Sequence, residues 1–550
     1  MSSESSKSPS PLSRALQLLR PSHQHSAFSA TVLLMSMVML SRIIGYVREL
    51  YIAWAFGVTR VTDAYNAGFT VPDWVNYLVA GGTASITFVS IYSRFIAEKR
   101  EEDAQKTFSI IVTVMTSVLL CGIILAEIFT PALNHWMFPG FNAAQLELTN
   151  HLTRILLPAQ LFFYVGGVVS AVLLTHRLFL LPALGPLIYN LLIIVSGVLF
   201  SRQLGIASLA YGAVGGAFIG IFLISAIGAA RKGIGYKVSF DVRNAAFLEW
   251  VRLSVPLMVG VSLVTADDWI LRHFPSDSTG AISRFNYAKR LFLVPIAVLG
   301  QAAGQASFPF FAKLFGEKRL GEFAATVNNS VSRLVALSLL ASGFMISSSL
   351  PLIDLAYRRG HFQFSDSVET AIYFSWFSVS LALWAAQALY ARAYYASGNT
   401  LVPMVATTVI FAASLPMYAA MHRALATTGL AIASDIGITF NCVVIAYLLH
   451  RRGLVSFQGL HWAELGKSAL TALIATGVSF KVGSLIPLIG GRVADLESLG
   501  LSTVTYAGCV AAGLWMMRSK LLDDLKRRKP ATYPAAAEKQ AEVSGSGVES

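Results

Sequence analysis

The sequence predicts an all-α polytopic membrane protein with about 14 transmembrane helices. Of its 550 residues, 55% are hydrophobic and 13% are charged, whereas an ordinary soluble domain has roughly 25% charged residues. Long apolar runs recur along the chain, and each is long enough to cross a hydrocarbon core of roughly 30 Å. A transmembrane β-barrel would instead show short segments of alternating hydrophobicity.

The predicted spans lie between two polar end segments. Residues 1–26 are rich in Ser and Pro, and residues 518–550 are basic and then rich in Ala, Glu and Ser, so we expect both segments to be disordered. The first has no apolar core, so no cleavable signal peptide is predicted. The spans lie near residues 27–56, 62–93, 106–131, 150–175, 179–201, 204–230, 246–272, 281–312, 325–350, 366–395, 400–421, 427–450, 466–489 and 497–517.

An internal repeat divides most of these spans into two lobes. Segments 171–182 and 392–403 resemble each other, and each ends one span and opens the next. Because an even number of spans separates the copies, both halves have the same orientation, an arrangement common in transporters. We therefore expect an N-lobe at 27–230, a C-lobe at 246–450 and two extra helices at 466–517.

The distribution of basic residues predicts the orientation. If the N-terminus is cytoplasmic, most loop Lys and Arg residues fall on the inner side, and the outer loop 132–149 has none. Cytoplasmic loops of membrane proteins carry such an excess of positive charge. We therefore expect both termini in the cytoplasm. The net charge of +13 reflects this orientation and does not indicate nucleic-acid binding.

The first two spans of each half contain nearly all charges at membrane depth. A charge at the centre of a span costs roughly 2.5–3.5 kcal/mol even on lenient insertion scales, so such residues usually face a protein interior or a wet cavity. Arginine binds phosphate well because its planar group donates two parallel hydrogen bonds. We predict a cationic cavity between the halves for an anionic substrate, lined by Arg42, Arg48 and Arg290.

Four other charged residues have a structural explanation. Arg252, Arg272 and Asp73 are expected at helix ends or in internal ion pairs. Asp63 is expected to orient an arginine rather than to meet the substrate.

Three further acids are candidates for ion pairing or ion binding. Asp267 and Asp268 either pair with Arg290 or hold a coupling cation, and the sequence leaves both interpretations open. Glu49 follows Arg48 directly and belongs to the same group of candidates.

No motif indicates catalysis, a cofactor or ATP-driven transport. The run Gly466, Lys467 and Ser468 lacks the glycine five positions earlier that a P-loop requires. The three cysteines lie in apolar runs without the spacing of a zinc site. We therefore expect a transporter, not an enzyme, with no cofactor and no metal. A gradient, the membrane potential or downstream consumption would drive it.

Five short motifs occur in order: SRIIGYVRE at 41–49, TDAY at 62–65, NYAKRL at 286–291, LAYRRGHF at 355–362 and YYASGNTLVP at 394–403. With these motifs the chain resembles the MurJ (MviN) lipid II flippases of the multidrug/oligosaccharidyl-lipid/polysaccharide exporter superfamily. The resemblance extends over the whole membrane part. One motif would be a weak signal, but five in order across 14 predicted spans are a strong one.

The resemblance implies two six-helix lobes in a V that move lipid II from the inner to the outer leaflet of the bacterial inner membrane by alternating access. The cationic cavity would take the diphosphate-sugar head group, and the two extra helices would line a groove for the polyprenyl tail. By position, Arg42, Arg48 and Arg290 match the family's cavity arginines, and Asp63 matches its second-span aspartate. Membrane lipids and cell-wall synthesis proteins are the other candidate partners.

The chain departs from the family's pattern at three places. Asn76 stands where members commonly have an arginine, and Lys289 is a cation where they often have an acid. Both remain candidate substrate-binding residues. Asp268 roughly matches an acid associated with sodium in some members, but span 400–421 lacks the Asn and Asp of those members. No sodium coupling is therefore expected.

Three alternative functions are open. A flippase for another polyprenyl-diphosphate glycan, such as an O-antigen or capsule unit, would keep the same lobes and the same diphosphate site. A multidrug exporter of the superfamily would favour an acidic cavity. A membrane-embedded glycosyltransferase would need acidic residues at a membrane surface. The first is the nearest rival to lipid II flipping.

Overall fold

The computed structural model confirms the all-helical prediction for the part of the chain that it describes. The expected disordered segment 1–26 and most of segment 518–550 lie outside that part. The side chains of Asp267 and Asp268 also lie outside it, although the backbone of their helix is described. The described residues are 27–80, 83–176, 178–264, 266–486 and 491–521.

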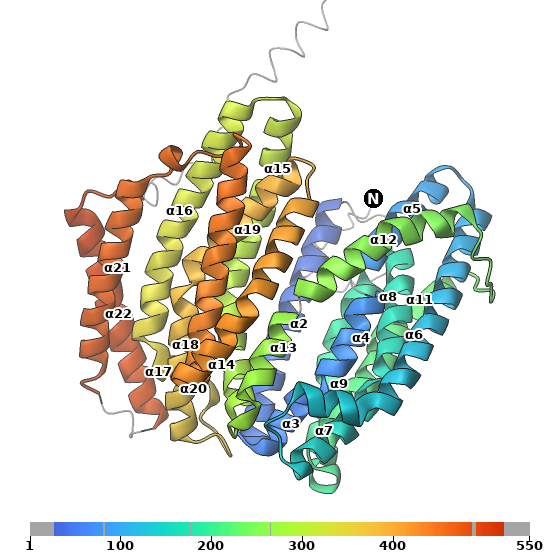
Figure 1. The fold of residues 1–550 in the computed structure, drawn as a ribbon, viewed down its shortest axis with the longest axis horizontal. Coiled ribbons are helices and arrows are strands. Elements are labelled where there is room, and N and C mark those ends of the chain that lie inside the picture. The colour runs from blue at the N-terminus through green and yellow to red at the C-terminus, as the bar shows by residue number, and fades with distance from the viewer. Residues whose placement is uncertain (1–26, 81–82, 177, 265, 487–490, 522–550) are drawn as a thin grey trace, which may run out of the picture.

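The first half of the chain folds into helices that run back and forth through the first lobe (Figure 1). The helices are α2 (Ala27–Phe56), α3 (Arg60–Gly68), α4 (Thr70–Ala80), α5 (Thr83–Ala97), α6 (Glu101–Met137), α7 (Ala143–Leu156), α8 (Ala159–Thr175), α9 (Leu180–Leu204), α10 (Ala207–Gly216), the π-helix η1 (Ala217–Leu223) and α11 (Ile224–Arg231).

The second half forms the other lobe and two helices at its outer edge, α21 and α22, far from the first lobe in Figure 1. Its elements are α12 (Ala245–Val264), α13 (Ala266–His273), η2 (Phe274–Asp277), α14 (Ala281–Pro295), the π-helix η3 (Ile296–Ala302), α15 (Ala303–Gly316), α16 (Leu320–Ser347), α17 (Ser349–Tyr357), α18 (Phe364–Val379), α19 (Leu381–Ala396), α20 (Leu401–Arg451), η4 (Phe457–Gly459), α21 (Trp462–Gly483) and α22 (Arg492–Met516).

Several helices are long enough to cross a membrane. Among the described residues, seven pass on length and composition, or eight if α18 and α19, bent by 43°, form one span. α20 contains non-helical backbone at Leu425 and Ala426, so it is two helical arms joined by a kink. Other predicted spans consist of shorter helices in succession, such as α3, α4 and α5. The total of about 14 crossings stays a prediction.

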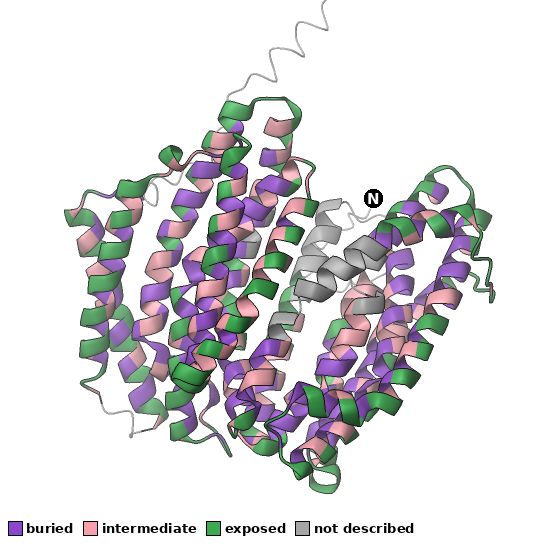
Figure 2. Ribbon diagram, viewed as in Figure 1, coloured by how far each residue is buried: buried purple, intermediate pink, exposed green. Residues whose placement is uncertain are grey.

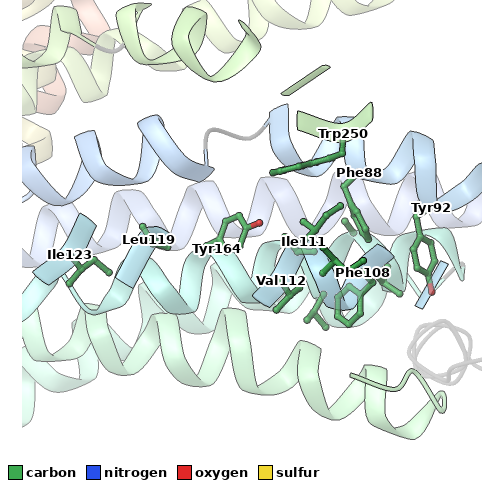
Figure 3. Packing of buried hydrophobic residues seen from close by; sticks show 14 of the residues in the cluster. Phe88, Tyr92, Phe108, Ile111, Val112, Leu119, Ile123, Tyr164 and Trp250 are labelled. Atoms are coloured by element: carbon green, nitrogen blue, oxygen red, sulfur yellow. The ribbon is translucent and has the colours of Figure 1, made fainter. Parts of the chain in front are cut away.

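The core of the first lobe is built from aromatic and branched side chains (Figure 3). Phe88 of α5 and Phe108 of α6 are buried there. Trp250 of α12 joins the same cluster, so α12 packs on α4 and α5 although its sequence opens the second half. Exposed apolar residues lie on the outer helices, for example Leu473 of α21 and Val504 of α22. Figure 2 shows this pattern of buried and exposed residues.

Besides the contact through α12, the two halves meet at one end of the bundle, which we call the junction end. It carries segments 57–59, 138–142 and 274–280, in the lower part of Figure 1. The Gly140 amide donates to Ser276 Oγ at 3.2 Å, and the His361 amide donates to the Trp54 carbonyl at 3.1 Å. These bonds join the first half of the chain to its second half, so they hold the lobes together at this end.

Candidate functional site

A cluster of three charged residues joins the two lobes inside the bundle. Arg48 and Glu49 are consecutive on α2, and Arg290 lies on α14. Glu49 Oε1 lies 2.6 Å from Arg48 Nη2 and 3.5 Å from Arg290 Nη2. The Glu49 side chain is 5% exposed and that of Arg48 is 14% exposed, whereas that of Arg290 is 46% exposed. One carboxylate thus sits between two guanidinium groups from different lobes, which leaves a net positive charge.

Asn190 of α9 completes the surroundings of Arg48. Arg48 Nη1 donates to Asn190 Oδ1 at 2.9 Å, and Asn190 Nδ2 donates to the Pro186 carbonyl at 2.9 Å. These two bonds fix the amide and present its oxygen to the arginine. Asn190 is not among the predicted site residues, although an asparagine within the apolar span 179–201 is a signal that indicates it.

Asp63 holds the helix that carries Arg290. It lies on α3 and is 1% exposed. Its carboxylate accepts hydrogen bonds from the Gly280 amide at 2.6 Å, the Ser283 amide at 2.9 Å and Ser283 Oγ at 2.7 Å. These donors open α14, so Asp63 caps that helix from the opposite lobe and satisfies amides that have no partner within the helix. Gly280 has φ +78°, a conformation that favours glycine.

A ladder of amide contacts continues this interface. Asn66 Nδ2 donates to Ser283 Oγ at 3.2 Å, and Asn286 Nδ2 donates to Asn66 Oδ1 at 3.3 Å. Both asparagines lie one turn further into their helices than the Asp63 cap. The starts of α3 and α14 are therefore joined side chain to side chain.

A small pocket lies beside this ladder, between α13 and α14. Arg272 and Lys289 contribute its two cations. Arg272 Nη1 donates to Thr70 Oγ1 at 3.0 Å and lies 3.8 Å from Asp73 Oδ2. The predicted residue Lys289 lines this pocket and its neighbour Arg290 does not, so the two side chains face different spaces. The full lining is Leu271, Arg272, Ile282, Phe285, Asn286 and Lys289.

The two remaining predicted site residues with described side chains lie apart from the central cluster. Arg42 is exposed and precedes Glu49 by two helical turns, about 10 Å, on the same face of α2. Asn76 is half-buried on α4, and its Nδ2 donates to Gln160 Oε1 of α8 at 2.8 Å. The central cluster therefore consists of Arg48, Glu49 and Arg290. Asp63 does not touch it and instead caps the start of the helix that carries Arg290.

This arrangement is suited to binding an anion. Two guanidinium groups can each donate parallel hydrogen bonds to phosphate oxygens. The one partner that they share is the carboxylate of Glu49, which an incoming diphosphate can replace. Since the two arginines come from different lobes, the anion would contact both lobes at once.

Comparison with known proteins identifies the family. The sequence matches the family described as Lipid II flippase MurJ over residues 52–486. A probable lipid II flippase MurJ of Rhizobium tropici is 24% identical over 514 residues, which cover 89% of this chain and 95% of the relative. The lipid II flippase MurJ of Burkholderia cenocepacia is 24% identical over 520 residues, which cover 91% of this chain and 99% of the relative.

Solved structures share the fold. A lipid II flippase MurJ in an inward closed conformation superposes with a TM-score of 0.74 at 21% identity, covering 88% of this chain and 99% of that one. An inward-facing multidrug resistance MATE family transporter of the MOP superfamily gives a TM-score of 0.60 at 15% identity, covering 77% of this chain and 98% of that one. The family match covers most of the chain, and the helical architecture agrees with it. This protein therefore belongs to the MurJ family of lipid II flippases.

Proposed function

We propose that this protein moves lipid II, the undecaprenyl-diphosphate-linked peptidoglycan precursor, from the inner to the outer leaflet of the bacterial inner membrane. The family match and the two MurJ relatives, each aligned over most of its length, support this substrate. The same comparisons do not favour a flippase for another glycan. Lipid II flipping is a transport step, so it requires no covalent chemistry at the site.

The central observation behind this proposal is the position of Glu49 between Arg48 and Arg290. Arginines at membrane depth are costly and usually mark a substrate path. Here the pair is neutralised only in part, by one acid, so the site has positive charge to offer an anion. The diphosphate of lipid II is the dianionic group that can engage both guanidinium groups.

The same geometry suggests how binding is linked to movement. With both termini in the cytoplasm, the junction end faces the periplasm, and the Asp63 cap on α14 keeps that end closed. A diphosphate that displaces Glu49 would remove the direct link between α2 and Arg290. Loss of this link would weaken the contact between the lobes, and the head group would be released outward once the Asp63 cap at the junction end also opens.

The polyprenyl tail remains in lipid while the head group crosses. We assign its path to α21 and α22, whose outer faces carry exposed apolar side chains such as Leu473 and Val504. These helices pack on α16 at the edge of the second lobe. The tail can therefore slide along the protein without entering the charged cavity.

The test is transport by the purified protein in liposomes. Fluorescent lipid II and a fluorescent undecaprenyl-diphosphate O-antigen unit are placed in separate vesicle preparations, and dithionite quenching reports how much of each reaches the outer leaflet. We expect transport of lipid II above the protein-free rate. Equal or faster transport of the O-antigen unit would contradict the assignment, as would failure to support growth of a strain depleted of its own lipid II flippase.

A further inference from the structure

An acid on α20 lies outside the site described above. Asp435 is on the second arm of α20, about 14 Å from the kink at Ala426. It is the only charged residue in the span 427–450, and it is 9% exposed. It lies on the buried face of the arm together with Ala431, Ile438 and Cys442.

The Asp435 carboxylate has no cationic partner in the described part of the chain. Neither of its buried oxygens accepts a hydrogen bond there. The Ser380 hydroxyl donates to the Phe377 carbonyl at 3.0 Å and also lies within hydrogen-bonding reach of the Asp435 carboxylate, so it is the one polar side chain beside this acid among the described residues. Thr439 Oγ1 donates to the main-chain carbonyl of Asp435 and not to its carboxylate.

No described cation faces this carboxylate. On the packing elements, Asp277 of η2 is paired with His422 of α20, and Glu249 of α12 is paired with Arg94 of α5. The other titratable side chains of the surrounding clusters are phenols and a thiol: Tyr373 of α18, Tyr390 of α19, and Tyr418 and Cys442 of α20.

Burial without a cationic partner favours the neutral form of an acid, because an isolated carboxylate in an apolar interior is strongly destabilised. The described residues contain no group of three acidic, histidine or cysteine side chains that could hold a metal ion. A proton needs only the carboxylate. We propose that Asp435 is a proton-binding site and that its protonation is coupled to the movement of the lobes.

The surroundings of Asp435 can convert protonation into movement. Ser380 lies at the 43° bend between α18 and α19, and the first amides of α19 follow it. The start of a helix carries a partial positive charge. An ionised Asp435 is attracted to that helix start and a neutral one is not, so the two forms favour different packing of α19 against α20. Arg290 lies on α14, and α14 packs on α18. Movement at the bend between α18 and α19 can therefore be transmitted to the helix that carries Arg290.

The first test detects the proton without lipid II. Infrared difference spectra of the full chain in lipid nanodiscs are recorded while the pH is changed. We expect a band of a protonated carboxyl group at neutral pH that is lost in Asp435→Asn and retained, shifted, in Asp435→Glu. The control Asp103→Asn removes an acid that is 50% exposed and should leave the band unchanged. A spectrum of Asp435→Asn identical to that of the wild type would overturn the proposal.

The second test measures coupling and rests on the proposed lipid II transport. Lipid II flipping is followed in liposomes with the membrane potential clamped by valinomycin and potassium, with and without a pH gradient. We expect the gradient to change the wild-type rate and to leave Asp435→Asn unaffected. If sodium at constant pH changes the wild-type spectrum or rate but not those of the variant, the site binds a metal cation and the proton assignment fails. Absence of flipping by the wild type refutes the transport function, whereas the spectra still decide the proton site.

Discussion

Replacement of Asp63 tests whether the lobes are held together by the cap on α14. Asp63→Ala removes three hydrogen bonds to Gly280 and Ser283, each with an ionised acceptor. Bonds to charged groups contribute roughly 1.5–3 kcal/mol each, and loss of a helix cap alone costs about 1 kcal/mol. Because the three bonds share one carboxylate and water can enter the gap, we expect a loss of about 2–4 kcal/mol for the closed state. Asp63→Asn keeps one acceptor and should lose about half as much.

The separation of the lobes at the junction end is the quantity to measure. Spin labels at the exposed positions Ala144 and Ser365, in a background without Cys121 and Cys509, report this separation by double electron–electron resonance. We expect a single short distance in the parent protein, a second and longer distance in Asp63→Asn, and mainly the longer distance in Asp63→Ala. The control Asp103→Asn should match the parent. An unchanged distance distribution in Asp63→Ala would refute the reasoning.

Three further predictions follow from the charged clusters. Arg48→Ala and Arg290→Ala should each abolish lipid II flipping in liposomes while normal amounts of protein insert, whereas Lys99→Ala at an exposed loop should flip normally. Arg358→Ala leaves the buried carboxylates of Asp354 and Asp495 without their cation, so thermal unfolding in detergent should show a loss of about 3–5 kcal/mol; Arg359→Ala, at an exposed position, should unfold like the wild type. Glu249→Gln breaks an exposed pair with Arg94 and should cost less than about 1 kcal/mol in the same assay.

The helical class and the family were predictable from the sequence, because both depend on features that are local in the chain. Long apolar runs indicate spans whatever their partners are, and five short motifs suffice for the resemblance that the family match confirms. The breaks within spans were not predicted. Span 281–312 was expected as one helix, but its backbone changes to a π-helix directly after Pro295, where a proline disrupts the regular hydrogen bonds.

The candidate site was predictable only as a list of charged residues. The separation of 217 residues between Asp63 and Gly280 leaves no local signal of their contact, so Asp63 could be assigned only a general orienting role. Glu49 was predicted only as an acid that forms ion pairs or binds an ion. Its contact with both arginines depends on how α2 and α14 pack, which the sequence does not specify. Asp435 was not predicted as a site residue, because a single acid in the long apolar run 427–450 does not change the prediction of a membrane span.

If the two arginines bind the diphosphate as proposed above, the acid between them explains how the site can also release it. Without Glu49, the two guanidinium groups would repel each other, and α2 and α14 could approach closely only when the substrate was present. The bound anion would then be the main link between these two arginines, and its release would be slow. Glu49 provides an internal anion that holds Arg48 and Arg290 when the substrate leaves. Because the substrate must compete with this carboxylate, binding is weaker than two free arginines would allow, and the empty transporter can return to the closed state.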